Sequence, residues 1–472
     1  MDGTRTAGRW PVGRGRRFGR RGLVALVATL LGLTWAMSAA PAQADTPIES
    51  IEQIGTIALG SDAVDPYEMV LVDDRYLYVG NEGRNDPDRG GSIFIVDLTT
   101  GDIIDRQWFD DRPWFLGGYV VDLYQGDNGY IYASFPTEGH LVIFDPTLPV
   151  GAQEINDIDL QGMTGDPNVY NQSVAAVGDT IFVADDDGRS GVIMMPLDGS
   201  SISTYPLTED ARPFVPAAEA HGYIKATAES IAVSPDGAFV YVGAHLLMVS
   251  DSGWGLFMAY SVGADGSLNF EYASLCEPLE LIHNIIVTQQ HIYAPSIIFT
   301  SVEADHNVYV FDNNAGTVTL SGVIELDAIV QTSYLSTDGL LYVAFNLVRG
   351  GAFAVIDPTV GSIGEVVYEV DNQDEPMIAL AFNSDGTRIY VSNHGDHYST
   401  APVVLVYALT RQPAPGPGPG PLPDTGAGAT SDLLGPALGL TAAGLVLLLV
   451  RPVFLNAPSG AGQVGRRALK RS

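Results

Sequence analysis

Residues 231–244 read Ile-Ala-Val-Ser-Pro-Asp-Gly-Ala-Phe-Val-Tyr-Val-Gly-Ala, and this stretch carries the pattern that decides the fold. An apolar run comes first, a polar turn follows at Asp236-Gly237, and a second apolar run contains Tyr241. Asp-Gly between two apolar runs is a favoured hairpin turn. The stretch therefore predicts two antiparallel strands joined by a short turn.

The same hairpin pattern recurs along the chain. Its second strand carries a leading aromatic residue each time, at Tyr78, Tyr132, Phe182, Tyr241, Tyr293, Tyr342 and Tyr390. Consecutive positions are separated by 54, 50, 59, 52, 49 and 48 residues. Most units add a third strand that ends at an aspartate, such as Asp97 or Asp145, and then a more polar fourth strand. This repeat predicts an all-β chain that forms a seven-bladed β-propeller of four-stranded antiparallel blades.

The two ends of the repeat region predict how the ring closes. The seventh unit ends at Tyr407-Ala408-Leu409 without a fourth strand, and an additional strand at 51–59 precedes the first unit. We expect this N-terminal strand to complete the last blade, since pairing the two removes exposed sheet edges. The propeller is expected to occupy residues 45–410.

Several repeat residues resemble a known family. The Tyr-Val-x-Asn strands at 78–81 and 390–393, the Ser-Pro-Asp-Gly turn at 234–237 and the ending formed by Val96, Asp97 and Gly101 are similar to those of YVTN/lactonase-like seven-bladed propellers. The resemblance covers about residues 50–410. It implies the architecture, and it leaves the activity open, because members include bacterial surface proteins, sugar lactonases and streptogramin lyases.

The N-terminal end predicts export. Residues 1–44 contain an arginine-rich stretch, an apolar run and small residues that end in Ala42-Gln43-Ala44, the pattern of a cleaved signal peptide. The mature chain would then begin near Asp45. General secretion and twin-arginine export both remain open as the route.

The C-terminal end predicts attachment to the cell wall of a Gram-positive-type bacterium. The pentapeptide Leu422-Pro423-Asp424-Thr425-Gly426 fits the LPxTG motif that sortases cut between Thr and Gly. An apolar segment at 433–450, expected to be helical, and a basic tail follow it, an order that holds the precursor in the cytoplasmic membrane. We expect sortase and peptidoglycan as partners, covalent attachment through Thr425 and removal of residues 427–472. A plain membrane anchor is the alternative.

Residues 411–421 are rich in alternating Pro and Gly, and they predict a disordered, extended spacer between the propeller and the sorting motif at 422–426.

Between residues 45 and 425 the chain has 11 Lys and Arg against 54 Asp and Glu, a net formal charge of −43. This acidity argues against nucleic acid and anionic lipid as partners. The single cysteine, Cys276, excludes an intramolecular disulfide and is expected to be buried.

Ligands of propellers usually sit where the innermost strands begin. Residues near those starts are Glu68, Trp114, Asn171, Gln172, Glu229, His283, Asn284, Gln331 and Glu375. Carboxylates and a histidine are ligands for divalent cations, so Glu68, Glu229, His283 and Glu375 are the predicted metal ligands, for Ca²⁺ or another divalent ion. Glu229 and His283 are the catalytic candidates. The alternative is a polar, water-filled channel without chemistry.

A second candidate metal site, for a transition metal, is the pair His394 and His397, with Asp396 between them.

The leading functional expectation is a monomeric, non-catalytic surface module that binds a protein or glycan of the host or of a neighbouring surface. The alternative is a wall-bound lactonase- or lyase-like enzyme with a divalent metal at the channel mouth. Because one fold supports many functions, the sequence leaves both open.

Overall fold

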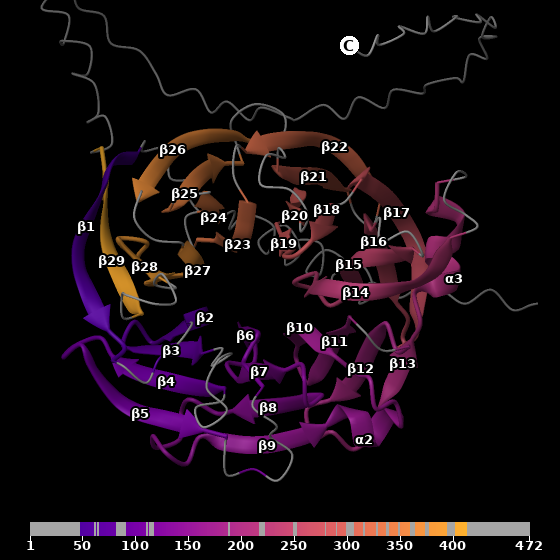
Figure 1. Cartoon of the computed structure of the whole chain (residues 1–472), viewed down its shortest axis with the longest axis horizontal. Helices are drawn as coiled ribbons and strands as arrows, with labels where there is room; N and C mark the ends of the chain where they lie inside the picture. Colours follow the sequence, from indigo (N-terminus) through magenta and orange to yellow (C-terminus); the bar gives the residue numbers. More distant parts are fainter. Residues whose placement is uncertain are drawn as a thin grey trace, which may run out of the picture. The chain divides into compact units, whose positions relative to one another are not determined.

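In the residues described by the computed structural model, the strands form seven antiparallel sheets arranged around a common axis (Figure 1). These residues are 48–60, 63, 66–81, 91–109, 112, 118–186, 189–216, 222–248, 253–278, 280–288, 290–298, 306–314, 317–326, 329–336, 339–347, 350–358, 364–372, 377–393 and 402–412. The chain divides into two compact units, Met1–Ala414 and Pro415–Ser472, and every described residue belongs to the first. The seven-bladed propeller expected from the repeat is confirmed.

Each blade begins with its innermost strand and continues outward. The first blade contains β2 (Pro66–Val72), β3 (Tyr76–Asn81), β4 (Ser92–Asp97) and β5 (Asp102–Trp108). The second contains β6 (Asp122–Gln125), β7 (Ile131–Phe135), β8 (His140–Phe144) and β9 (Glu154–Asp159). The third contains β10 (Asn171–Val177), β11 (Thr180–Asp185), β12 (Val192–Pro196) and β13 (Ser203–Tyr205).

The fourth blade contains β14 (Tyr223–Val233), β15 (Phe239–Met248), β16 (Trp254–Val262) and β17 (Leu268–Pro278). The fifth contains β18 (Glu280–Ile282), β19 (Ile286–Val287), β20 (His291–Ile298), β21 (His306–Asn314) and β22 (Thr317–Leu326). The sixth contains β23 (Ile329–Leu335), β24 (Leu341–Leu347), β25 (Gly350–Asp357) and β26 (Glu365–Asn372). Short helical turns, α2 (Leu160–Thr164), α3 (Thr208–Ala211) and η1 (Arg212–Phe214), follow the outer strands β9 and β13.

The seventh blade joins the two ends of the ring. It contains β27 (Met377–Phe382), β28 (Arg388–Asn393) and β29 (Val403–Arg411), and its outermost strand is β1 (Ile48–Ala58). β1 pairs with β29 in antiparallel register from Ile48 opposite Arg411 to Ala58 opposite Val403. The predicted closure by the N-terminal strand is therefore confirmed, with a strand that begins three residues earlier than expected.

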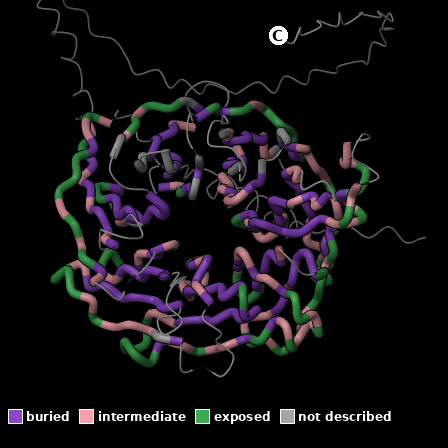
Figure 2. The backbone as a smooth tube through the Cα atoms, in the orientation of Figure 1, coloured by how far each residue is buried: buried purple, intermediate pink, exposed green. Residues whose placement is uncertain are grey.

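The repeated aromatic residues lie where neighbouring blades pack together. Each of the seven belongs to the second strand of its blade, and each side chain is at most 3% exposed. Figure 2 shows that buried residues gather on the inner and middle strands, whereas exposed residues lie mainly on the outer strands. The apolar faces of adjacent sheets therefore form the core, and the spaced aromatic residues fill it.

The fifth blade departs from regular pairing at its innermost strand. β18 and β19 both pair with β20, but His283, Asn284 and Ile285 lie between them without a place in the ladder. The opposing residue is Pro295, which accepts a hydrogen bond from the His283 backbone N–H at 3.2 Å but has no N–H to donate in return. The missing donor explains why the innermost strand is interrupted there.

Candidate functional site

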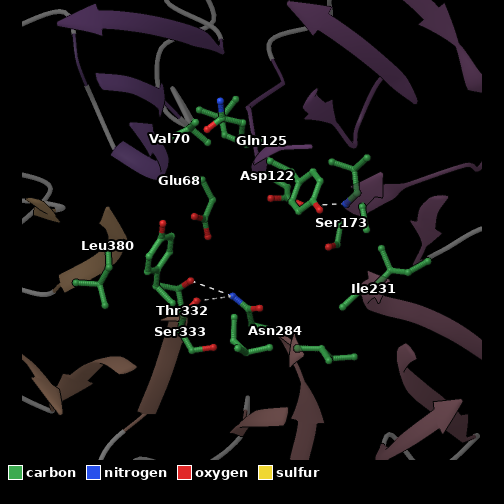
Figure 3. Close-up of a pocket in the computed structure, with 18 of the residues that line it drawn as sticks. Glu68, Val70, Asp122, Gln125, Ser173, Ile231, Asn284, Thr332, Ser333 and Leu380 are labelled. Carbon is green, nitrogen blue, oxygen red and sulfur yellow. Dashed lines mark hydrogen bonds between the residues drawn. The ribbon is translucent and has the colours of Figure 1, made fainter. Parts of the chain in front are cut away.

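A cavity of about 420 Å³ lies along the central channel of the propeller. Residues of all seven innermost strands line it, and Figure 3 shows several of their side chains directed toward the shared space. Polar lining residues include Glu68, Asp122, Gln172, Ser173, Glu229, His283, Asn284, Thr332 and Ser333. A cavity of this size is in the range that holds a small organic molecule.

Irregular pairing places many of these polar residues in the channel. Regular pairing is interrupted between Pro66 and Met69, where Glu68 lies, and between Ala228 and Ser230, where Glu229 lies. Comparable shifts occur between Asn171 and Ser173, between Val330 and Thr332, and between Met377 and Leu380. A β-bulge redirects the unpaired side chain away from its place in the sheet. Repeated bulges at one level thus build a polar ring in the channel.

Two carboxyl groups in this ring lie in an environment that favours their neutral forms. Burial raises the pKa of Glu68 well above its ordinary range, and the nearby Asp122 carboxylate raises it further. Burial also raises the pKa of Asp122 to about 6, although hydrogen bonds from the Val174 backbone and the Ser173 side chain oppose this shift. The Val174 N–H donates to Asp122 Oδ2 at 2.7 Å. Two such carboxyls near each other resist simultaneous ionisation.

Glu229 and His283, the two catalytic candidates, lie side by side across the boundary between the fourth and fifth blades. Their Oε1 and Nδ1 atoms are 3.5 Å apart. His283 Nδ1 is buried and makes no hydrogen bond within the described structure. The separation is long for a hydrogen bond, so the pair is close but not locked together. Glu229 is 4% exposed.

The wall of the channel at the sixth blade is tied to the interrupted strand of the fifth. The Asn284 side-chain amide donates to Thr332 Oγ1 at 3.1 Å and to the Ser333 backbone carbonyl at 3.3 Å (Figure 3). These bonds hold the Asn284 side chain against the neighbouring blade. Asn284 therefore supports the geometry of the wall around His283.

The channel also has an apolar and aromatic wall. Leu380 and Phe382 of β27, Tyr334 of β23 and Ile231 of β14 line the cavity. The rings of Tyr334 and Phe382 stack with centroids 4.8 Å apart and planes 19° apart. Asp122 begins β6 and Gln172 is the second residue of β10, whereas Tyr334 and Phe382 come near the ends of their strands. The cavity therefore combines a polar, acidic part with an aromatic part.

The structure brings together only part of the predicted ring. Glu68, Gln172, Glu229, His283 and Asn284 line the cavity. Asn171 is fully buried and instead donates to Ser134 Oγ and to the His140 carbonyl, so it joins two blades. Trp114 and Glu375 lie outside the described residues, as does the side chain of Gln331. Asp396 and the two histidines beside it lie outside them as well.

Asp122, Ser173, Thr332 and Ser333 line the channel but are not among the predicted ring residues. For the second blade, the predicted start of the innermost strand is Trp114, whereas β6 begins at Asp122. A spacing rule was available: Glu68 and His283 each precede the aromatic residue of their own hairpin by ten positions. The same spacing counted back from Tyr132 selects Asp122.

In the described parts of the chain, no three His, Cys, Asp or Glu residues lie close enough together to hold one metal ion. The predicted set of Glu68, Glu229, His283 and Glu375 includes one residue beyond those parts, so it stays a prediction. The predicted signal peptide with Ala42 and Ala44, the spacer from 413 onward, and the sorting motif 422–426 also fall outside the described residues. Within those residues, no helix has the length and hydrophobicity needed to cross a membrane.

Comparison with protein-family models and with curated proteins finds no match for this chain. Among solved structures, it is similar to Raptor from Chaetomium thermophilum, with a TM-score of 0.55 and 12% identity over 79% of this chain and 30% of that one. It is also similar to the β-propeller domain of Cps50 (Swd1) from Myceliophteria thermophila, with a TM-score of 0.53 and 10% identity over 76% of this chain and 100% of the domain. The chain thus spans less than a third of Raptor. At such identities the similarity shows the β-propeller fold alone.

Proposed function

We propose that the protein is a cell-wall-anchored display module whose propeller is a non-catalytic recognition head. The head is carried on the Pro/Gly-rich spacer and joined through Thr425 to peptidoglycan. Its ligand is a protein or a glycan on a neighbouring surface. A wall-bound lactonase- or lyase-like enzyme with a divalent metal stays the alternative.

The position of the last strand supports this proposal. β29 ends at Arg411, the first residue of the predicted spacer, and it pairs with β1 on one side and with β28 on the other. A pull along the spacer would therefore act on a strand that is hydrogen-bonded along both edges. Unfolding from that end requires several such bonds to break together, which suits a head that is held at one point.

Fractionation of cells tests the anchoring. In a Gram-positive host that carries a sortase, the wild-type protein should resist extraction by boiling detergent and appear after digestion of the peptidoglycan. Thr425→Ala should move the protein into the membrane fraction or the medium, because sortase attacks the Thr425 carbonyl. Ser431→Ala, outside the pentapeptide, serves as the matched control and should behave like the wild type. Wild-type protein that detergent extracts completely would refute covalent anchoring.

A further inference from the structure

The charged groups around the channel are unbalanced. Among the described residues that line the cavity, Glu68, Asp122 and Glu229 carry carboxyl groups, and none is Lys or Arg. His283 is the one basic side chain in this described lining. Carboxylates that are shielded from water need a cation or several hydrogen-bond donors to be stable in their charged form. A ligand that brings positive charge would supply this.

Two further polar atoms in the lining have no partner. Ser333 is 5% exposed, and its Oγ makes no hydrogen bond within the described structure, although the residue lines the cavity (Figure 3). His283 Nδ1 also makes no hydrogen bond within the described structure, and it lies 3.5 Å from Glu229 Oε1. Buried polar groups in proteins are nearly always hydrogen-bonded, so an unpartnered one in a cavity points to a missing partner. Both atoms can accept a hydrogen bond from an N–H group.

The remaining wall suits an organic body rather than a bare ion. Tyr334 and Phe382 present stacked rings, and Ile231 and Leu380 add aliphatic surface. Aromatic faces attract organic cations, and the aliphatic side chains bind their apolar parts. The volume of about 420 Å³ is far larger than a single metal ion needs. Among the described residues, no three carboxylate, histidine or cysteine side chains lie close enough together to hold one metal ion.

We propose that the central channel binds a small organic amine, with its ammonium group beside Glu68 and Asp122 and its apolar body against Tyr334 and Phe382. Ser333 Oγ accepts an N–H hydrogen bond from the ligand. Primary amines with an aromatic or aliphatic body fit this description. This site is independent of how the protein is anchored, so its test leaves the wall attachment untouched.

Isothermal titration calorimetry on the full-length chain in a non-ionic detergent tests the proposal. The probes are phenethylamine, hexylamine and spermidine at pH 7.5 and low salt, with 2-phenylethanol as the uncharged counterpart of phenethylamine. At least one amine should bind with one-to-one stoichiometry and a Kd of about 1 mM or lower. If phenethylamine binds, 2-phenylethanol should bind about tenfold or more weakly, because it lacks the ammonium group. No heat with any amine, or equal binding of the uncharged counterpart, would overturn the proposal.

Variants locate the site. Glu68→Gln and Asp122→Asn should each weaken amine binding about tenfold, the loss expected for one charged hydrogen bond. Ser333→Ala should weaken amine binding less, because this substitution leaves the charge of the site unchanged. Asp198→Asn is the matched control, because Asp198 lies in the exposed turn after β12. Unchanged binding in all three channel variants, or tight binding of CaCl₂ that competes with the amine, would contradict an amine site here. Melting curves identify any variant that does not fold.

Discussion

Aspartates at the ends of two third strands, Asp97 and Asp145, form the same type of turn. Asp97 Oδ1 accepts hydrogen bonds from the Thr99 backbone N–H at 2.9 Å and from Thr99 Oγ1 at 2.6 Å. Asp145 Oδ1 accepts the same two bonds from Thr147, at 2.9 and 2.6 Å. This geometry is an Asx turn, which replaces backbone pairing where the strand ends. At these two positions the recurring aspartate is therefore a turn residue.

Glu68 and Asp122 predict that the head is less stable at pH 8 than at pH 5. A carboxyl whose pKa is raised by folding stabilises the folded state while it is protonated. For Asp122 this stabilisation is complete below its ordinary pKa of 3.8 and is lost as the pH rises through about 6. Glu68 acts in the same direction. Over this whole pH range the loss for Asp122 is on the order of 2–3 kcal/mol, and about half of it falls between pH 5 and pH 8.

Thermal unfolding at the two pH values measures this effect. The double variant Glu68→Gln/Asp122→Asn should melt at a higher temperature than the wild type at pH 8, and this difference should be smaller at pH 5. Asp198→Asn is the control with the opposite sign, because hydrogen bonds from Ser200 lower the pKa of Asp198. If the double variant kept the wild-type pH dependence, the acidity of the remaining surface would be its cause.

At the scale of elements, neighbouring blades meet closely where β15 passes β18. A Cβ atom on Gly243 would lie 2.6 Å from the Ile282 carbonyl oxygen and 2.4 Å from Ser230 Oγ. The Ser230 hydroxyl donates to that same carbonyl at 2.8 Å. A glycine is therefore required in β15, and it keeps the fifth blade's innermost strand close to the fourth blade.

Gly243→Ala should reduce the free energy of unfolding by about 1–3 kcal/mol, the usual cost of inserting an atom into a packed contact. Urea denaturation measures this loss. Gly55→Ala is the matched control, since its Cβ would lie 4.0 Å from the nearest side-chain atom and should cost little. Equal stability of the two variants would mean that β15 and β18 can separate at no cost.

The hairpins were predictable from the sequence, but the channel was predictable only in part. Alternation of apolar residues and Asp-Gly turns depends on local chemistry, so the second strands led by Tyr241 and its counterparts were found correctly. The bulges that direct Glu68 and Glu229 into the channel depend on pairing with another strand, and no local sequence pattern identifies the residue that is left unpaired. The interruption at His283 follows from Pro295, which lies on the partner strand β20 rather than beside His283 in the sequence.

At the scale of the whole molecule, one strand pairing closes the ring. Ile51 of β1 is 7% exposed and belongs to a buried cluster with Leu405, Tyr407 and Leu409 of β29. Those contacts join residues from opposite ends of the head. This pairing was predictable because the seventh repeat has no fourth strand of its own, whereas an additional strand precedes the first repeat.

Ile51→Asp should open this closure, because it places a charge in the buried cluster at a cost on the order of 3 kcal/mol or more. The expected results are a lower melting temperature and a larger species in size-exclusion chromatography, since β29 would present a free edge. Ile54→Asp on the same strand is the control, because Ile54 is 55% exposed. Identical melting of the two variants would show that the seventh blade holds without β1.

The pairing of β1 with β29 also determines when folding of the propeller can be completed during synthesis. The two strands that complete the seventh blade lie at opposite ends of the head, so a chain that emerges N-terminus first carries β1 unpartnered until β29 has followed it. Any product of interrupted synthesis that lacks 403–411 keeps an open blade and a loose first strand. Proteases attack such open segments in preference to closed ones. We therefore expect incomplete chains, which cannot close the seventh blade, to be degraded faster than complete chains.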